Sequence, residues 1–369
     1  MKRTRTYALA GIAAASSLLL SACSDDNTTD SGDSGSGSSE SAAKIDCGTG
    51  DLNASGSSAQ AKAIDTWQST FAASCSDIAV NYDPSGSGAG IKDFIAGKTD
   101  MAGSDSSLKD DEATQANARC ASGKAINIPM VVSPVAVAYN VSGVDKLTLN
   151  AEVLSKIFAG QITTWDDEAI KALNKDAKLP STTITTVHRS KDSGTTDNFT
   201  KFLEAAGNGA WTFGTGKAWT APGGQGAPDS AGIVSAVKGT DGSISYVDGP
   251  DAKANSLKTA AIDSGKGGVE ISDESVGKAV AAAERSGEGN DIKLKLNYAL
   301  QEEGAYPAVL VTYEITCEKG LDPAKAKTVK SFLTYTSSDA GQKALTDLGY
   351  SPLPKEVLAE VTKAVEAIS

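Results

Sequence analysis

From Ile45 onward, short apolar runs alternate with stretches in which apolar residues recur at helical spacing. The short runs predict buried strands, and the recurring pattern predicts amphipathic helices. The expected strands include 77–82, 125–132, 135–139, 182–188, 242–247 and 308–316. Helices are expected over 59–73, 90–97, 150–158, 195–206 and 323–335. Strands that alternate with helices in this way indicate an α/β fold.

The N-terminal pattern is different. Basic residues precede an apolar run over 8–20, which is short for a membrane span and typical of an export signal. The run ends in Leu-Ser-Ala-Cys at Cys23, which resembles the lipobox of bacterial lipoproteins. We therefore expect residues 1–22 to be a lipoprotein signal peptide and Cys23 to carry the lipid. The alternative is a plain secretory signal followed by an incidental cysteine.

Almost every residue of 24–41 is Ser, Gly, Asp, Asn or Thr. Such a composition cannot bury a core and behaves as a flexible linker. Residues 23–44 are thus expected to be the lipidated cysteine and its tether. They would hold the folded part at the extracytoplasmic face of the cell membrane.

The chain has four further cysteines, Cys47, Cys75, Cys120 and Cys317. An even number in an exported chain favours two disulfides, for which three pairings exist. Cys47 precedes the first expected strand and Cys75 the second, so neighbouring strands would bring these two together. Cys120 would then pair with Cys317. The alternative is that these thiols are free and buried.

Charge and residue usage exclude several functions. With 34 basic and 46 acidic residues, the net charge is −12, which argues against a nucleic-acid partner. A single histidine excludes a His-rich metal centre, and the cysteines are too scattered for a zinc finger, so no metal is expected. The sequence has no Gly-x-Ser-x-Gly motif, so a serine hydrolase that uses this histidine, His188, is not supported, and we interpret His188 as structural. Neither a dinucleotide-binding GxGxxG motif nor a P-loop has all of its glycines at the required spacing, so no cofactor is expected.

Three loops rich in Ser and Gly lead directly into expected helices, over 54–58, 84–90 and 189–195. The N-terminus of a helix carries unpaired N–H groups and a partial positive charge, and small residues let an anion approach them. Each loop can therefore cradle an anion, although a Ser/Gly loop more commonly only caps its helix.

Two charged residues make the anion hypothesis more specific. Arg189 ends an expected strand, where its guanidinium can hold two oxygens of a tetrahedral anion. Asp105 follows another short apolar segment. A carboxylate can accept the proton that phosphate still carries near neutral pH, whereas it repels fully deprotonated sulfate. An ordinary capping role is the alternative for Asp105.

These segments resemble the phosphate-binding proteins of bacterial phosphate ABC transporters. The similarity runs from about residue 46 to 361, and its most specific motif is Arg-x-x-x-Ser-Gly-Thr, which begins at Arg189. Residues 165–170 and 348–354 support it. The resemblance implies an α/β, two-lobed, hinged periplasmic-binding-protein-like fold, with each lobe a mixed sheet flanked by helices. Residues 46–132 plus 305–369 would form lobe 1, and residues 133–304 lobe 2.

The resemblance also implies a function. The chain would bind inorganic phosphate between the lobes and deliver it to the permease subunits of an ABC transporter, as a monomer and not as an enzyme. The phosphate-binding positions that it implies are Ser58, Ala59, Ser87, Asp105, Arg189, Ser193, Gly194 and Thr195. The alternatives are a binding protein for another tetrahedral oxyanion, a surface phosphatase, and a surface interaction lipoprotein.

One position departs from the family pattern. The family's loop has an aspartate two residues after the arginine, where this chain has Lys191 followed by Asp192. Because a buried lysine is costly, we expect Lys191 to face solvent and Asp192 to take the partner role beside Arg189. The alternative is that Lys191 makes the site more positive.

Overall fold

The computed structural model describes residues 45–121 and 123–369. The predicted signal peptide, Cys23 and the whole of the predicted tether lie outside these residues. Within the described part, every helix is too short or too polar to cross a membrane. The described residues belong to one compact unit.

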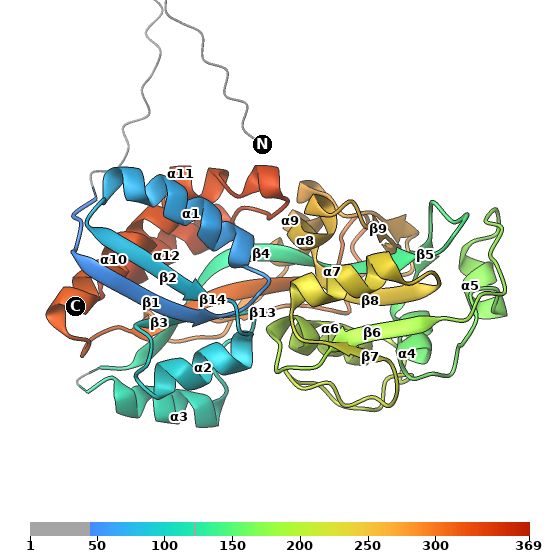
Figure 1. The fold of residues 1–369 in the computed structure, drawn as a ribbon, viewed down its shortest axis with the longest axis horizontal. Coiled ribbons are helices and arrows are strands. Elements are labelled where there is room, and N and C mark those ends of the chain that lie inside the picture. The colour runs from blue at the N-terminus through green and yellow to red at the C-terminus, as the bar shows by residue number, and fades with distance from the viewer. Residues whose placement is uncertain (1–44, 122) are drawn as a thin grey trace, which may run out of the picture. The chain divides into compact units, whose positions relative to one another are not determined.

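A mixed sheet of nine strands forms the centre of the described part (Figure 1). Its order is β2-β1-β3-β14-β4-β8-β6-β7, and β9 also pairs with β4. The strands are β1 Gly50–Gly56, β2 Ile78–Asp83, β3 Met101–Ser104, β4 Ala125–Asn140, β6 Thr185–Arg189, β7 Gln225–Ala227, β8 Ser243–Asp248, β9 Lys258–Thr259 and β14 Val309–Cys317. Two small sheets contain β5 Thr148–Leu149, β10 Ala261–Asp263 and β11 Gly268–Val269, and β12 Glu284–Arg285 and β13 Leu294–Lys295.

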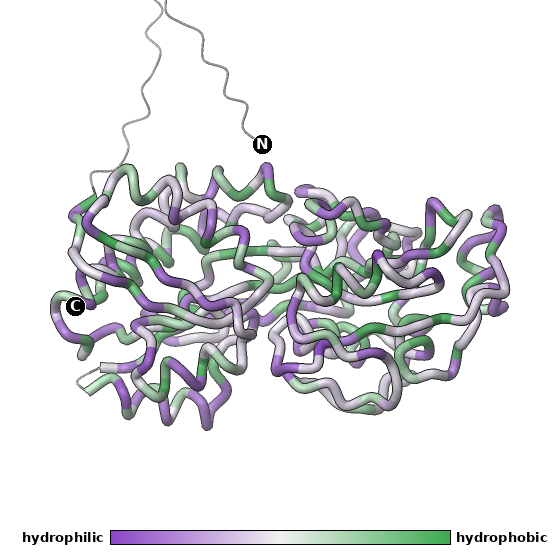
Figure 2. Tube along the Cα trace, in the orientation of Figure 1, coloured by the Kyte–Doolittle hydropathy of each residue, from purple (hydrophilic) through white to green (hydrophobic). Residues whose placement is uncertain are grey.

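β4 is one long strand, whereas the sequence predicted two. Its first part, up to Pro134, pairs with β14, and its second part, from Val135, pairs with β8. Proline lacks a backbone N–H, and Pro134 lies at the point where the strand changes partner. The strand therefore continues through the proline. Its residues are buried as far as Tyr139, and in Figure 2 the strand is largely hydrophobic.

Helices cover the sheet on both faces. In Figure 1, α1 and α10 lie on one side of β1 and β2, and α2 and α3 on the other. The helices are α1 Ala61–Ser74, α2 Ser87–Ile95, α3 Asp110–Arg119, α4 Ala151–Phe158, α5 Glu168–Leu173, α6 Gly194–Ala206, α7 Ser230–Gly239, α8 Gly249–Ala254, α9 Asp273–Ala281, α10 Pro323–Thr336, α11 Asp339–Lys343, the short 3-10 helix η1 Thr346–Leu348 and α12 Lys355–Glu366.

The predicted apolar stripe of α1 explains its packing. Ala63, Ile64, Trp67 and Phe71 are buried. The rings of Trp67 and Phe71 meet Phe332 of α10 edge to face, with centroids 6.4 and 5.3 Å apart. Helical spacing in the sequence therefore identified the buried face correctly. The mixed α/β class is confirmed.

The start of α2 differs from the prediction, which placed it at residue 90. The helix begins at Ser87, because Gly86 adopts a φ of +107° and turns the chain directly out of the preceding loop. Ser87 is thus the first residue of the helix and not part of a loop. Its hydroxyl is buried at the helix N-terminus.

Both predicted disulfides are present. Cys47 pairs with Cys75 and Cys120 with Cys317, each with a Cα–Cα distance of 5.5 Å. β1 and β2 pair in parallel from Gly50 and Ile78 onward, so neighbouring strands do bring the first two cysteines together. The second bridge joins the end of α3 to the end of β14.

Candidate functional site

The loop between β1 and α1 contributes the first part of the site. Gly56 ends β1 with a φ of +147°, and a Cβ there would lie 2.0 Å from the carbonyl oxygen of Gly103. Only glycine therefore allows β1 and β3 to approach so closely at this edge. Ser58 follows, buried at 7% exposure, and Ala59 is buried at 1%. The N–H of Ala59 donates to Ser57 Oγ at 3.0 Å.

Asp105 lies directly after β3, with 1% of its surface exposed. Thr312 of β14 donates its hydroxyl to Asp105 Oδ1 at 2.8 Å. On the other oxygen, Oδ2, the hydroxyls of Thr195 and Ser87 lie at 3.4 and 3.5 Å. The carboxyl group is therefore surrounded by hydroxyls from three separate elements.

Burial raises the pKa of Asp105, because an ionised carboxylate is poorly solvated there. Hydrogen bonds from Ser57, Thr312 and Thr195, and the positive charge of Arg189, oppose this shift without cancelling it. A carboxyl group with a raised pKa accepts a proton more readily. Asp105 is therefore suited to accept a hydrogen bond from a ligand that carries a proton.

Arg189 ends β6 with 3% of its surface exposed. Its Nη1 donates to Ser58 Oγ at 3.1 Å and to Ser193 Oγ at 3.0 Å. Its Nε and Nη2 both donate to the carbonyl oxygen of Pro228, at 3.3 and 3.1 Å. Within the described residues, Arg189 forms no ion pair with a carboxylate. The guanidinium is thus fixed by neutral oxygens and keeps its charge for a ligand.

The N-terminus of α6 completes the cluster. Ser193 caps the helix by accepting from the N–H of Thr196 at 3.4 Å. Gly194 and Thr195 are its first two residues, and both are buried. A Cβ on Gly194 would lie 2.6 Å from both Asp105 Cβ and Ser87 Oγ. The helix end is therefore pressed against the carboxyl group.

The structure thus gathers all the predicted anion-site positions into one buried cluster. Hydrogen bonds connect Ser58, Ser193 and Arg189, and a second set connects Ser87, Thr195 and Asp105. Gly194 contacts the second set, and Ala59 adjoins Ser58 in the chain. One guanidinium, several hydroxyls, the N-termini of α2 and α6 and one carboxyl group with a raised pKa lie together.

Lys191 is exposed, as expected, but the expectation for Asp192 is wrong. Asp192 pairs with Lys92 Nζ at 3.1 Å. The Nε and Nη2 groups of Arg189, which Asp192 was expected to bind, donate instead to the carbonyl oxygen of Pro228. Asp192 is therefore free to form an exposed ion pair with α2.

Sequence reasoning missed two neutral partners of the site. Thr312 holds the Asp105 carboxyl, and the hydroxyl of Tyr246 accepts from the backbone N–H of Arg189 at 3.1 Å. Thr312 had a signal in the sequence, because it is a polar residue inside the apolar strand pattern of 308–316. Tyr246 had none, since an aromatic residue in a strand is ordinary core material.

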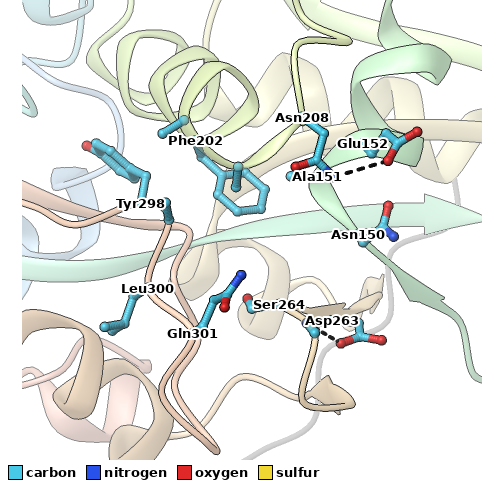
Figure 3. Close-up of a pocket in the computed structure, with 14 residues that line it drawn as sticks. Asn150, Ala151, Glu152, Phe202, Asn208, Asp263, Ser264, Tyr298, Leu300 and Gln301 are labelled. Atoms are coloured by element: carbon cyan, nitrogen blue, oxygen red, sulfur yellow. Dashed lines mark hydrogen bonds between the residues drawn. The ribbon is translucent and has the colours of Figure 1, made fainter.

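Two cavities lie near these elements. One, of about 270 Å³, reaches Asp105 and Ser106 and is also lined by Lys201 and Lys295. The other, of about 240 Å³, is drawn in Figure 3. Its lining contains the carboxylates of Glu152 and Asp263 and no basic side chain, so it does not suit an anion.

The cluster has the chemistry of a binding site. His188 lies outside it, with its ring stacked on Trp219 at 5.1 Å, so the structural interpretation of this residue agrees with its packing. In the described part, no group of three or more His, Cys, Asp or Glu residues is placed to hold a metal. What the arrangement offers is dehydrated hydrogen-bond donors and one proton acceptor for a small tetrahedral anion.

Comparisons with known proteins agree with this geometry. The PBP superfamily domain model matches residues 35–340. Phosphate-binding protein PstS 3 of Mycobacterium tuberculosis (strain ATCC 25618 / H37Rv) is 44% identical over 374 residues, 100% of both chains. PstS 3 of Mycobacterium leprae is 41% identical over 360 residues, 96% of both chains.

A solved structure shows the same fold. The high-affinity periplasmic phosphate-binding protein PfluDING, bound with phosphate, superposes with a TM-score of 0.68 at 23% identity. The match covers 85% of this chain and 93% of that one. The chain therefore belongs to the PBP superfamily and, within it, to the family of phosphate-binding proteins named PstS.

Proposed function

We propose that this chain binds inorganic phosphate outside the cytoplasm and delivers it to an ABC permease for import. The observation that carries the proposal is that one buried cluster holds both an arginine with no ion pair to a carboxylate among the described residues and an aspartate with a raised pKa. The names of the PstS relatives support the same ligand.

Recognition follows from the donors in the cluster. The Nη1 of Arg189 and the hydroxyls of Ser58 and Ser193 already converge, and an anion entering there would accept their hydrogen bonds. The N-terminal N–H groups of α2 and α6 add partial positive charge. Asp105 would accept the proton of the bound phosphate. Sulfate has no such proton and would meet only repulsion.

We further propose that binding closes two lobes, formed by residues 46–132 plus 305–369 and by residues 133–304. Contacts between these two sets support a closed state. Besides the cluster itself, Lys62 pairs with Asp251, and Lys217 pairs with Glu112 at 2.9 Å. Phosphate would shift the population toward this state, because only the closed form offers it donors from both sets.

The proposal includes a position in the cell. A lipid on Cys23 would keep the protein at the membrane beside its permease, where tethering raises the effective concentration. We infer a monomer that binds and releases phosphate without chemical change. A phosphatase remains the less favoured alternative, since in the described part no hydroxyl of the cluster is hydrogen-bonded to a histidine and no group of three or more His, Cys, Asp or Glu residues is placed to hold a metal.

Titration calorimetry with phosphate, after partial unfolding and dialysis to remove copurified ligand, tests the proposed function. We expect one phosphate to bind per chain and excess sulfate not to compete. The variant Asp105→Asn should lose about tenfold in phosphate affinity, a typical cost for a hydrogen bond to a charged group, and should admit sulfate. Absence of phosphate binding by the unaltered protein would move the assignment to another oxyanion.

Lys191→Asp restores the residue that is usual in the family and should leave the phosphate Kd within about twofold. Lys191 is exposed, and the partners of the Arg189 guanidinium are already supplied by Ser58, Ser193 and Pro228. Surface charges of this kind contribute little to the free energy. A gain of tenfold in the same calorimetric titration would show instead that the lysine reduces affinity.

A further inference from the structure

Glu314 is a buried carboxyl group that the proposed function does not use. It lies in the middle of β14 with 0% of its surface exposed, and in the described part neither carboxyl oxygen has a hydrogen-bond partner. An ionised carboxylate in that position would lack both water and a counter-charge, which is costly. The structure therefore accommodates Glu314 best in its neutral, protonated form.

β14 places Glu314 behind the anion site. Thr312, two residues earlier in the strand, donates to Asp105, and Glu314 is paired with Gly103, two residues before Asp105. On the other side, β4 presents Ile128, which is apolar. The two carboxyl groups consequently lie near enough for the charge of Asp105 to raise the pKa of Glu314.

A series of polar side chains connects the surroundings of Glu314 to the loop between β1 and α1. Gln60 occupies the space above Gly103, where a Cβ would lie 1.8 Å from Gln60 Nε2. That nitrogen donates to the hydroxyl of Tyr82 at 3.0 Å, and the hydroxyl donates to the Ser57 carbonyl at 2.7 Å. Gln60 Oε1 is buried without a donor. If Glu314 is protonated, its O–H group can donate a hydrogen bond to Gln60 Oε1.

Among the titratable groups around Glu314, Asp105 raises the pKa of Glu314, and Glu314 in turn raises the pKa of Tyr82. Burial raises the pKa of Glu314 to about 8, the nearby amide of Gln60 acts to lower it, and the charge of Asp105 raises it further. In the described part no basic group contributes to this shift. We therefore expect Glu314 to be mostly neutral at neutral pH and to ionise under mildly alkaline conditions.

We propose that Glu314 makes anion binding depend on pH: its neutral form admits the anion, and its ionisation adds a second negative charge behind Asp105 that weakens binding. This inference rests on the proposed function, in which the anion is phosphate. A bound anion disfavours the ionised carboxyl, so binding at alkaline pH must be accompanied by proton uptake. Affinity then falls by up to about tenfold for each pH unit above the pKa of Glu314.

Phosphate calorimetry at several pH values between about 6.5 and 9.5 tests this, with Glu314→Gln compared against the unaltered protein. Phosphate's own ionisation affects both proteins equally, so the ratio of their Kd values isolates Glu314. We expect a ratio near one at the acid end, and binding about tenfold tighter in E314Q at the alkaline end. The exposed Glu284→Gln serves as the control and should follow the unaltered protein. Identical pH profiles for E314Q and the unaltered protein would overturn the inference.

A second measurement does not require the variant to fold. In protein labelled with ¹³C only at glutamate carboxyl groups, one resonance should titrate at about 8 and move to higher pH when phosphate is added. If all glutamate resonances titrate in the ordinary range, or if phosphate moves none, the inference fails. Absence of phosphate binding at every pH would be a different result, which overturns the proposed function itself.

Discussion

Arg189→Ala should weaken phosphate binding by about 2–5 kcal/mol, the range for removing one partner from a buried charged pair. The guanidinium is the one basic group that the structure places among the predicted anion-site positions of the described part, and it already directs Nη1 between Ser58 and Ser193. In its absence, the anion would retain helix N-termini and hydroxyls but no full positive charge. Calorimetry should show the Kd rising by about thirtyfold or more.

Arg119→Ala is the matched control for this variant. Arg119 is also partly buried, donates from Nη2 to the carbonyl oxygen of Thr99 at 2.6 Å, and stacks over the ring of Phe94 at 4.2 Å. It has no contact with the anion-site residues. R119A should therefore lower the unfolding temperature and leave the phosphate Kd unchanged. A loss of less than tenfold in R189A would contradict the role given to Arg189.

Gly194→Ala should reduce phosphate affinity by about 3 kcal/mol, roughly a hundredfold, although it adds a single methyl group. That methyl would lie 2.6 Å from Asp105 Cβ and Ser87 Oγ, and neither neighbour lies on a long, flexible side chain that could move aside. The variant should keep its fold, because alanine favours helix and Gly194 already starts α6 with ordinary dihedral angles. The methyl should act by preventing closure.

Small-angle scattering separates this mechanism from simple misfolding. The unaltered protein should become more compact on phosphate addition, and G194A should not. Gly277→Ala is the control, because Gly277 lies inside α9 with nothing within 4 Å of the added methyl group. G194A that binds phosphate with unchanged affinity would show that the contact between α6 and Asp105 is not required for the bound state.

The parts of the fold that carry strong apolar patterns were predictable from the sequence. The buried face of α1 and the positions of β2, β8 and β14 follow directly from spacing. α3 was not predicted, because Ala116 is its only buried residue and its sequence shows almost no apolar pattern. The continuity of β4 through Pro134 was also hidden, since a strand's change of partner leaves no mark in the local sequence.

The site residues that lie close together in the sequence could be predicted. Those that meet only through contacts between distant parts of the chain could not. Arg189 and Ser193 lie four residues apart in one loop, so their type and spacing indicated an anion site. The contact of Asp105 with Thr312 joins residues 207 positions apart. The Pro228 carbonyl that holds Arg189 is a backbone group, which any residue could supply. No residue-type pattern identifies such a partner.

The insertion of β14 between β3 and β4 affects the order in which the parts of the chain can fold. β1 and β2 can pair early, and the bridge between Cys47 and Cys75 can then form. β3 can pair with β1, and β4 with β8, but the edges of β3 and β4 that face β14 must wait for that distant strand. The separation of 197 residues between Cys120 and Cys317 imposes the same delay on the second bridge. Until then the partly folded chain exposes unpaired strand edges, so chaperone binding and premature pairing of Cys120 with another cysteine compete with correct folding.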